Sequence, residues 1–503
     1  MSAAVATAAP VAQELLRVDP RTLVVGANAR LDVRLHKAFI RSIGQRGVLE
    51  PVVAYRGEGG ELVVLFGQRR TLAAVQAGRD TVPVMVVPRP EESDRIIDQV
   101  SENDHREGLL VGERVAAFEQ LSAFGVSAAQ IVKQTARPRG EVDRALAVAK
   151  SRVARAAVDR WAFLTLEQAA AVAEFDGDDE AVKQLVVAAK QGGFDHMAQR
   201  LRDARDEAAA RDVVMRELAE SGVMVVERPT FDHPAVKRLG QLLHDGVELT
   251  EGGHIGCPGH AAFLETQWIR PDEPEAHAEQ DDADGDGELD AAGRAEPYRG
   301  WVPVFVCTDF AAYRHTLRWE QTRTGGNGAG KSAGMSDRER EQTRQQRRDV
   351  IASNKDWDSA QTVRRRWLRT FLARKTAPAG AVAFVAGSLA AADHEITRAL
   401  TSGHRLAHEL LGLGDQAPTL GRRTPAVVGL VEKAGAGRAQ QLLLGLVLAA
   451  YEDVAGRHSW RQVSDSTSRY LRFLEASGYE LSAVEQRACH PHEVVDAVPL
   501  TAA

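Results

Sequence analysis

The chain has 503 residues and an apolar fraction of 44%, which is typical of two to four folded domains. Its three cysteines, Cys257, Cys307 and Cys489, cannot build a disulfide framework, which favours a reducing cytoplasm over secretion. The net charge of −7 is concentrated in residues 271–297, which carry −10. The rest of the chain is weakly basic, so the overall acidity does not exclude a nucleic-acid partner.

No segment predicts a secreted or membrane-spanning protein. The start, "MSAAVATAAPVAQELL", lacks the basic region and long apolar core of a secretory signal. The longest apolar run, Leu442–Tyr451, is too short to cross a bilayer and predicts a buried helix. We therefore expect a cytoplasmic protein without a membrane partner.

Residues 15–110 predict an α+β domain. "LLRVDP" reads as a strand, and "LDVRLHKAFIRSIGQRG" as a helix that ends at Gly47. "VLEPVVAYRGEGGELVVLF" predicts two strands around a Gly-rich turn. The helix "GQRRTLAAVQAG", bracketed by Gly67 and Gly78, and the strand "TVPVMVVP" complete the pattern.

The strand "LVVLF", Gly67 and the following helix predict an anion site. The backbone amides at the start of a helix and two guanidinium groups, Arg69 and Arg70, converge there, which suits a polyphosphate. The alternative is that both arginines only make surface ion pairs. The local pattern leaves both readings open.

Residues 111–205 predict an all-α DNA-binding domain. "LSAFGVSAAQIVKQTARPRGEVDRALAVAKS" contains a helix capped by Ser127, a turn, and a second helix with Val142, Leu146 and Ala149 on its buried face. An ordinary helical hairpin would have the same pattern, because helix pairs are common. Basic residues that suit DNA phosphates and base edges lie on or near the outward surface: Lys133, Arg137, Arg139, Arg144 and Lys150.

Three ordered motifs resemble the ParB/KorB/RepB-type plasmid and chromosome partition proteins. They are "SIGQRG", "GQRRTLAA" followed by "AGRDTVP", and "ENDHR", and the resemblance covers roughly residues 17–205. The resemblance implies that CTP with Mg²⁺ binds at Gly47, Gly67, Gln68, Arg69, Arg70, Glu102, Asn103 and Arg106. Gln68 and Leu72 stand where the family has Glu and Arg.

The resemblance also implies a function. A homodimer would bind a centromere-like site on double-stranded DNA and close into a clamp around the DNA when CTP binds. It would act with a ParA-type ATPase, on a plasmid or on the nucleoid. Because Gln68 cannot act as a general base, we expect at most a slow CTPase and assign no catalytic residue. Two alternatives remain: a KorB-type transcriptional regulator, and a ParB-fold nuclease or sulfiredoxin-like enzyme. The sulfiredoxin-like chemistry would need a Cys at the turn where this chain has Gln68.

Residues 206–320 predict a small mixed domain with a sparse Cys/His set. Cys257, His260, Cys307 and His315, with His254 as a further candidate, could form a Cys2His2 zinc site. The alternative is two buried cysteines and surface histidines. The acidic insert 271–297 begins like a calcium loop, but position twelve is Gly293 instead of Glu, which favours an acidic insert without calcium.

"GGNGAGKS", Gly325–Ser332, matches the phosphate-binding loop of P-loop NTPases letter for letter. Its flanks, "RHTLRWEQTRT" and "AGMSDREREQTRQQRRD", supply neither the buried strand nor the apolar helix that the loop needs. We therefore interpret residues 321–336 as a Gly-rich linker.

Residues 337–503 predict an all-α C-terminal domain, for which dimerisation is the expected role. "VRRRWLRTFLARK" places Arg365, Arg366 and Arg369 on exposed helix rows opposite Trp367 and Phe371. This surface could contact DNA or simply be the solvated face of an amphipathic helix.

Overall fold

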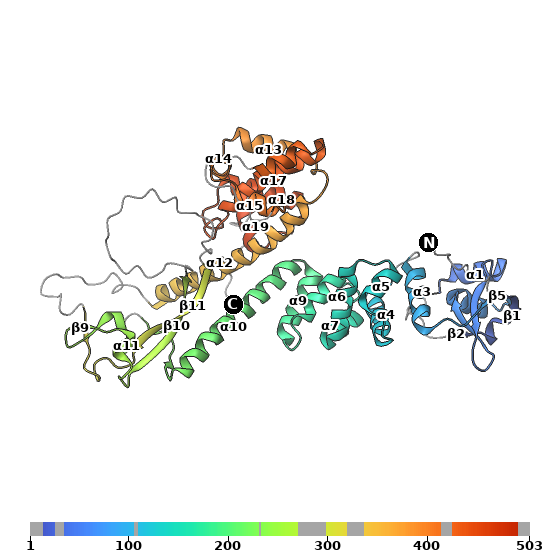
Figure 1. Ribbon diagram of the computed structural model, residues 1–503, viewed down its shortest axis with the longest axis horizontal. Coiled ribbons are helices and arrows are strands. Elements are labelled where there is room, and N and C mark those ends of the chain that lie inside the picture. The colour runs from blue at the N-terminus through green and yellow to red at the C-terminus, as the bar shows by residue number, and fades with distance from the viewer. Residues whose placement is uncertain are drawn as a thin grey trace, which may run out of the picture. The chain divides into compact units, whose positions relative to one another are not determined.

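The computed structural model describes residues 14–25, 35–104, 109–230, 233–269, 298–318, 337–413 and 425–490 (Figure 1). Three segments interpreted from the sequence lie outside the described residues: the acidic insert 271–297 with its calcium-like start, the linker 321–336 with its P-loop-like motif, and Arg106. The chain forms two compact units, Met1–Phe194 and Asp195–Ala503, which are described separately.

The first unit begins with a five-stranded mixed sheet in the order β1-β5-β3-β4-β2. β3 pairs in parallel with β5 and antiparallel with β4, and β1 pairs antiparallel with β5. The elements are β1 (Glu14–Val18), β2 (Val24–Val25), α1 (Lys37–Arg46), β3 (Val52–Arg56), β4 (Leu62–Phe66), α2 (Gln68–Gln76) and β5 (Val82–Val87). This order confirms the predicted α+β domain.

The core of this domain consists of alternate strand residues and the inner face of α2. Val52, Ala54, Val82 and Val84 are fully buried, and Ala73 and Ala74 of α2 pack on them. Strand residues alternate between the two faces of a sheet, so these three valines and Ala54 point to one side, where α1 and α2 cover them. This packing fixes the position of α2 over β3.

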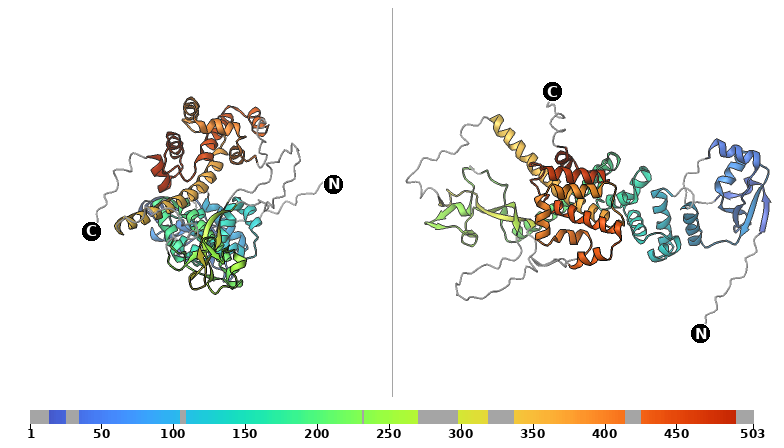
Figure 2. Two further views of the ribbon diagram at one scale, coloured as in Figure 1. Left: turned by 90° about the vertical axis from the view of Figure 1, so that its left-hand side faces the viewer. Right: turned by 90° about the horizontal axis from the view of Figure 1, so that it is seen from above.

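Seven helices complete the first unit. They are α3 (Glu92–Asp104), α4 (Val111–Ala123), α5 (Ala128–Thr135), α6 (Arg139–Lys150), α7 (Arg152–Arg160), α8 (Leu166–Ala173) and α9 (Asp179–Gln191). Helix α6 packs against α4, α5, α7 and α8, so it lies at the centre of this helical part. Figure 2 shows the same ribbon from two further sides.

The second unit begins with one long helix, α10 (Phe194–Glu220), of which all but Phe194 belongs to this unit. The boundary predicted at residue 205 falls inside this helix. No Gly or Pro occurs between Phe194 and Glu220 to interrupt it, so the helical pattern runs on. Salt bridges join α10 to the later helices, including Arg200–Asp356 at 3.3 Å and Lys355–Glu207 at 2.6 Å.

Two small sheets follow α10, in the orders β6-β10-β11-β7 and β12-β8-β9. The long β10–β11 hairpin pairs His260 with Cys307 and Ile269 with Tyr298. The elements are β6 (Met224–Val225), β7 (Lys237–Arg238), β8 (Leu242–His244), β9 (Val247–Glu248), α11 (Glu251–His254), β10 (His260–Ile269), β11 (Tyr298–Cys307) and β12 (Thr316–Leu317).

The remaining described residues form a helical domain around one buried helix, α17 (Ala436–Val454), which includes the predicted buried run. The other helices are α12 (Asp337–Leu372), α13 (Ala381–Ala390), α14 (His394–Thr401), α15 (Arg405–Leu410), α16 (Pro425–Glu432), α18 (Asp465–Ala476) and α19 (Ala483–Cys489). None of the helices in the described ranges is both long enough and apolar enough to cross a lipid bilayer.

Candidate functional site

The turn at Gly67 joins β4 to α2 in a left-handed backbone conformation. Gly67 has φ 97° and ψ 21°, and it provides no side chain to cap the helix. A Cβ atom there would lie 3.4 Å from the Cα of Val52 and 3.4 Å from the Arg70 guanidinium. The turn thus requires glycine, and it aims the first amides of α2 along the helix axis, where a phosphate binds best.

Arg70 holds this turn against the start of β3. Its Nη1 atom donates to the carbonyl oxygens of Glu50 at 2.8 Å and Pro51 at 3.2 Å, and it pairs with the Glu50 carboxylate at 3.0 Å. Arg69 extends to α1 instead, where its guanidinium carbon lies 5.5 Å from the centroid of the Phe39 ring. Arg70 therefore supports the turn, while Arg69 stacks on α1.

Helices α5 and α6 form the predicted helix-turn-helix. Ser127 caps α5 by accepting from the backbone of Gln130, whose side chain accepts in return from the Ser127 amide. Ala136 makes the turn with φ 54°, and α6 begins after Pro138. Ile131 of α5 is fully buried against the neighbouring helices.

The buried stripe of α6 differs from the expected one. Val142 is buried as predicted, but the other buried positions are Ala145 and Val148, while Leu146 and Ala149 are only half-buried. The reason is that α4 and α8 pack on α6 from two sides, and small residues face the closest approach.

The basic residues of this motif are paired with carboxylates. Arg139 contacts Asp143 at 2.8 Å, and Arg144 contacts Glu167 at 3.1 Å, all with exposed side chains. Such surface pairs contribute at most about 1 kcal/mol, so a DNA phosphate can replace the carboxylates.

The other basic positions are one half-buried arginine and two exposed lysines. Arg137 shares Glu141 with Arg114, at 3.3 and 3.0 Å, and the Glu141 side chain is only 15% exposed. Glu141 thus ties α6 both to Arg114 of α4 and to Arg137 in the turn before α6. Lys133 and Lys150 are exposed at the two ends of the motif.

Comparison with known proteins identifies the sheet domain. The family model of the ParB N-terminal domain matches residues 26–103. Residues 26–103 are a ParB N-terminal domain. The resemblance to ParB-type partition proteins is confirmed.

Curated relatives are similar to about a fifth of the chain. The probable chromosome-partitioning protein ParB of Treponema pallidum is 32% identical over 110 residues, which is 22% of this chain and 34% of the relative. The chromosome-partitioning protein Spo0J of Thermus thermophilus is 32% identical over 111 residues, which is 22% of this chain and 40% of the relative. The chain thus spans about a third to two-fifths of the length of these relatives.

A solved structure is also similar to this chain. It is the C-terminally truncated ParB of Caulobacter crescentus complexed to the centromeric parS site, at 20% identity, covering 35% of this chain and 92% of that chain. Its TM-score is 0.27.

Within the ParB N-terminal domain, the other nucleotide candidates are only partly placed. Gly47 ends α1 with φ 73°, and a Cβ atom there would lie 3.3 Å from the Arg79 guanidinium. Helix α3 runs through Glu102 and Asn103, but their side chains, like Arg106, are outside the described part of the chain. The assignment of these four residues to nucleotide binding still rests on the family resemblance.

Outside the ParB N-terminal domain, the fold gathers most of the expected metal ligands. His254, Cys257, Cys307 and His315 bring one donor atom each to within 4.8 Å of one another. His260, which the sequence favoured, is not in this group, and its Nδ1 atom faces His254 Nδ1 at 2.9 Å instead.

The electrostatics of this cluster reflect its burial. Burial, with additional repulsion from His315, His260 and His244, lowers the pKa of His254 to about 4, so its imidazole is neutral near pH 7. Burial also raises the pKa of the Cys307 thiol to about 12.

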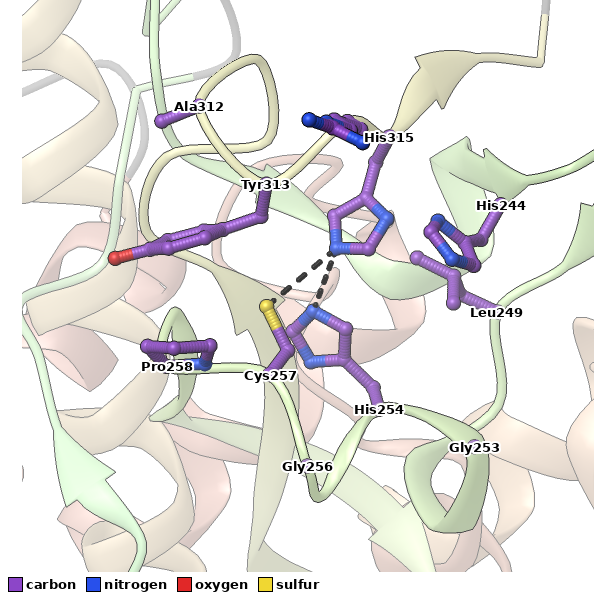
Figure 3. A pocket seen from close by; sticks show the side chains of 11 residues that line it. His244, Leu249, Gly253, His254, Gly256, Cys257, Pro258, Ala312, Tyr313 and His315 are labelled. Atoms are coloured by element: carbon purple, nitrogen blue, oxygen red, sulfur yellow. Dashed lines mark hydrogen bonds between the residues drawn. The ribbon is translucent and has the colours of Figure 1, made fainter.

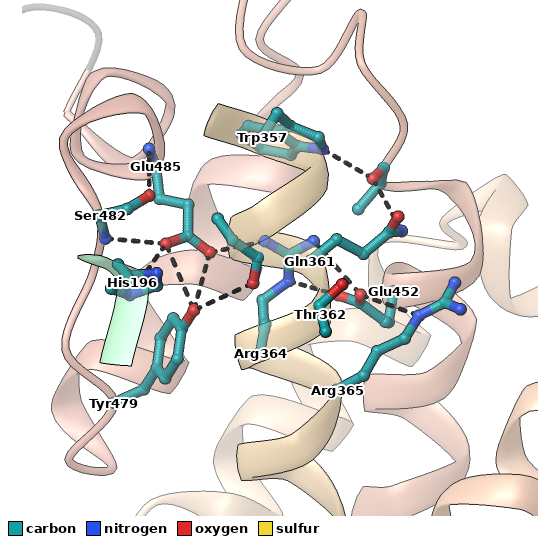
Figure 4. A network of polar contacts seen from close by, with 12 residues as sticks. His196, Trp357, Gln361, Thr362, Arg364, Arg365, Glu452, Tyr479, Ser482 and Glu485 are labelled. Atoms are coloured by element: carbon teal, nitrogen blue, oxygen red, sulfur yellow. Dashed lines mark hydrogen bonds and ion pairs between the residues drawn. The ribbon is translucent and has the colours of Figure 1, made fainter. Parts of the chain in front are cut away.

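Sequence reasoning did not identify the polar centre of the C-terminal domain. Arg364 is fully buried between Glu452, at 2.5 Å, and Glu485, at 2.6 Å (Figure 4). Desolvation opposes the charge, yet the two carboxylates raise the pKa of Arg364 well above its ordinary value. The neighbouring Arg365 is half-buried and pairs with Glu452 at 3.3 Å, so it does not lie on an exposed row as expected.

Arg366 and Arg369 are exposed as the sequence predicted. Arg369 pairs with Glu409 of α15. The exposed basic surface in this part of α12 therefore contains Arg366 and Arg369 but not Arg365. A DNA-contacting role for this surface stays a prediction.

Proposed function

We propose that this chain is a sequence-specific DNA-binding partition protein that loads on centromere-like sites as a CTP-gated clamp. The observation that carries the proposal is the order of its parts. A ParB N-terminal domain, matched over residues 26–103, is followed directly by the helix-turn-helix of α5 and α6. The curated relatives that match part of this chain are partition proteins.

The Gly67 turn suits a nucleoside triphosphate. It offers the N-terminus of α2, which has no side-chain cap and which Arg70 fastens to the residues just before β3. The Arg69 guanidinium, stacked on Phe39 of α1, adds a positive charge in the first turn of this helix. We assign CTP, with Mg²⁺, to this turn together with Glu102 and Asn103 of α3 and with Arg106, which follows in the sequence. Bound CTP would supply the binding energy that closes two N-terminal domains of a homodimer around DNA.

The two departures from the family pattern affect different steps. Gln68 can hydrogen-bond a water molecule but cannot accept its proton near neutral pH, so we expect CTP to be bound and cleaved slowly. Leu72 stands where the family has Arg, which removes one cation and is expected to weaken affinity.

A binding experiment with three matched variants tests the nucleotide site. Arg69→Ala should weaken CTP binding at least tenfold, because it removes a charge-assisted contact. Arg89→Ala is the control within the same domain: it also removes an Arg, but this exposed Arg pairs with Glu58 at the opposite end of the β3–β4 hairpin. Lys331→Ala should leave binding unchanged.

The outcomes separate the two candidate nucleotide sites. Loss of binding in Lys331→Ala with full binding in Arg69→Ala would move the site to "GGNGAGKS" and overturn the assignment. Equal losses in Arg69→Ala and Arg89→Ala would show a general charge effect and would also contradict it.

Mapping the bound DNA across the host genome tests the role in partition. A partition protein should occupy a few sites and spread over the flanking DNA in a CTP-dependent way, on the nucleoid or on a plasmid. Copurification of a ParA-type ATPase would identify the expected partner. Binding confined to promoters, without spreading, would contradict the clamp and favour a KorB-type regulator.

A further inference from the structure

Four side chains that could hold a metal ion meet in the second unit, and three of them, His254, Cys257 and His315, line a pocket (Figure 3). His254 ends α11, Cys257 lies in the next turn, Cys307 ends β11, and His315 precedes β12. Three of the four are buried, and Cys257 is half-buried. Nothing in the ParB N-terminal domain or the helix-turn-helix requires this cluster.

The distances between the donor atoms fit a tetrahedral ion. His254 Nε2 and His315 Nε2 are 3.2 Å apart, and Cys257 Sγ and His315 Nε2 are 3.5 Å apart. Zinc bonds of usual length, arranged tetrahedrally, place two nitrogens about 3.3 Å apart and a sulfur and a nitrogen about 3.5 Å apart. Both measured distances therefore match the edges of a zinc tetrahedron.

The surrounding residues orient the ligands as metal sites usually do. With His254 Nε2 directed at the cluster, its other ring nitrogen, Nδ1, lies 2.9 Å from His260 Nδ1. The His260 ring is itself stacked on Phe305, with centroids 5.3 Å apart and planes at 16°. His260 is thus placed to hold the His254 ring by a hydrogen bond, which is the common role of a residue behind a ligand histidine.

The backbone is shaped to let the two cysteine segments approach. A Cβ atom on Gly259 would lie 2.8 Å from Cys307 Sγ and 2.6 Å from the Tyr313 ring, so only glycine fits between Cys257 and β11. Backbone hydrogen bonds from Cys257 to His254 O and from His260 to Cys257 O close the loop around Cys257.

The lobe that carries the cluster has a small hydrophobic core. Its buried members are Leu239, Leu242 and Cys307, with a few partly buried neighbours. Cores of this size rarely stabilise a fold without a disulfide or a metal ion. A bound ion would join α11, β11 and β12 where apolar packing is insufficient.

We propose that His254, Cys257, Cys307 and His315 bind a structural zinc ion that holds this lobe together. Two thiolates and two imidazoles in a tetrahedron are characteristic of zinc. All four positions are filled by the protein, so the site is structural and has no open position for a substrate. The adjoining pocket of about 380 Å³, lined by His244 and Tyr313 among others, provides the entry path.

Elemental analysis of the full chain, purified under reducing conditions, tests the site. The native chain should hold about one zinc per chain, and His254→Ala and Cys307→Ser should hold less than a tenth of that amount. His260→Ala should keep the zinc but lose about 10–100-fold in affinity in a chelator competition, because it removes only the supporting hydrogen bond. Cys489→Ser, which changes a cysteine in a distant helix, is the matched control and should keep full occupancy and affinity.

Cobalt provides a readout that does not depend on variants. The native chain, stripped of metal and loaded with Co²⁺, should show the intense visible bands of a tetrahedral ion with thiolate ligands. Less than a tenth of an equivalent of zinc in the native chain, or loss of both thiols to a disulfide, would overturn the proposal. Retained zinc in His254→Ala, or zinc lost in Cys489→Ser, would overturn the ligand set.

Discussion

Replacing Arg364 by Met should strongly destabilise the C-terminal domain. The change keeps an unbranched but shorter side chain, and it removes the charge and three hydrogen bonds to Glu452 and Glu485. Both carboxylates are fully buried, so they lose their guanidinium without gaining water. Breaking a buried ion pair by removing one partner costs about 3–5 kcal/mol.

The two carboxylates should not suffer equally. Glu452 keeps Arg365 at 3.3 Å and the Tyr470 hydroxyl at 2.8 Å. Glu485 keeps the Ser482 amide at 2.8 Å and the Tyr479 hydroxyl, but the structure pairs it with no second arginine among the described residues, and His196 Nε2 lies 3.8 Å away. Most of the cost should therefore arise at Glu485.

Thermal unfolding of the full chain measures this effect. The transition of the C-terminal domain, followed by the fluorescence of Trp357 and its neighbours, should shift down by about 10 °C, since each kcal/mol moves the midpoint by about 2–4 °C in domains of this size. The Trp357 ring lies 5.3 Å from the Arg364 guanidinium carbon and reports on the same site. Arg366→Met, on the exposed side of α12, is the control and should change stability by less than about 0.5 kcal/mol.

A double variant separates lost charge from lost packing. Arg364→Met with Glu485→Gln removes the unpaired charge and should recover about 1–2 kcal/mol relative to Arg364→Met alone. The deficit of the single variant should also shrink at acidic pH, because protonation relieves an unpaired buried carboxylate. A deficit below about 1 kcal/mol, or a double variant no more stable than the single one, would refute this reasoning.

Three further predictions concern hydrolysis, DNA binding and pH. Gln68→Glu should raise CTP hydrolysis with cognate DNA by about 10²-fold or more, and a native chain that already releases phosphate as fast would exclude Gln68 as the limiting residue. Arg139→Ala and Arg144→Ala should each cost about 1–3 kcal/mol of specific DNA binding if they read a base, or lower the salt slope by about one if they meet a phosphate; unchanged affinity and slope in both would remove α6 as the recognition helix. Burial lowers the pKa of His404 below its ordinary 6.5, so its contribution to stability is complete above pH 6.5 and declines as the pH falls below that value. His404→Gln should therefore show a smaller drop in denaturation midpoint between roughly pH 7.5 and 5.5, and an equal drop would contradict this sign.

The sequence alone determined the elements whose signals are local. The β-branched run of β4, the glycine after it and the helix formers of α2 are neighbours in the chain, so the Gly67 turn could be placed correctly. The Ser127 cap and the apolar run of α17 were readable for the same reason. Backbone propensity and capping act over a few residues, and they hold wherever the segment lies.

The tertiary structure decided what depends on distant residues. Local spacing favoured His260 as a ligand beside Cys257, but the pairing of β10 with β11 and the loop before it direct His254 to the cluster instead. Likewise, Arg364 appeared to be one basic residue in a run of three, and its burial depends on Glu452 and Glu485, which are 88 and 121 residues away. A charged side chain can be buried only where partners meet it, and the packing of separate helices, which no local pattern encodes, brings those partners together.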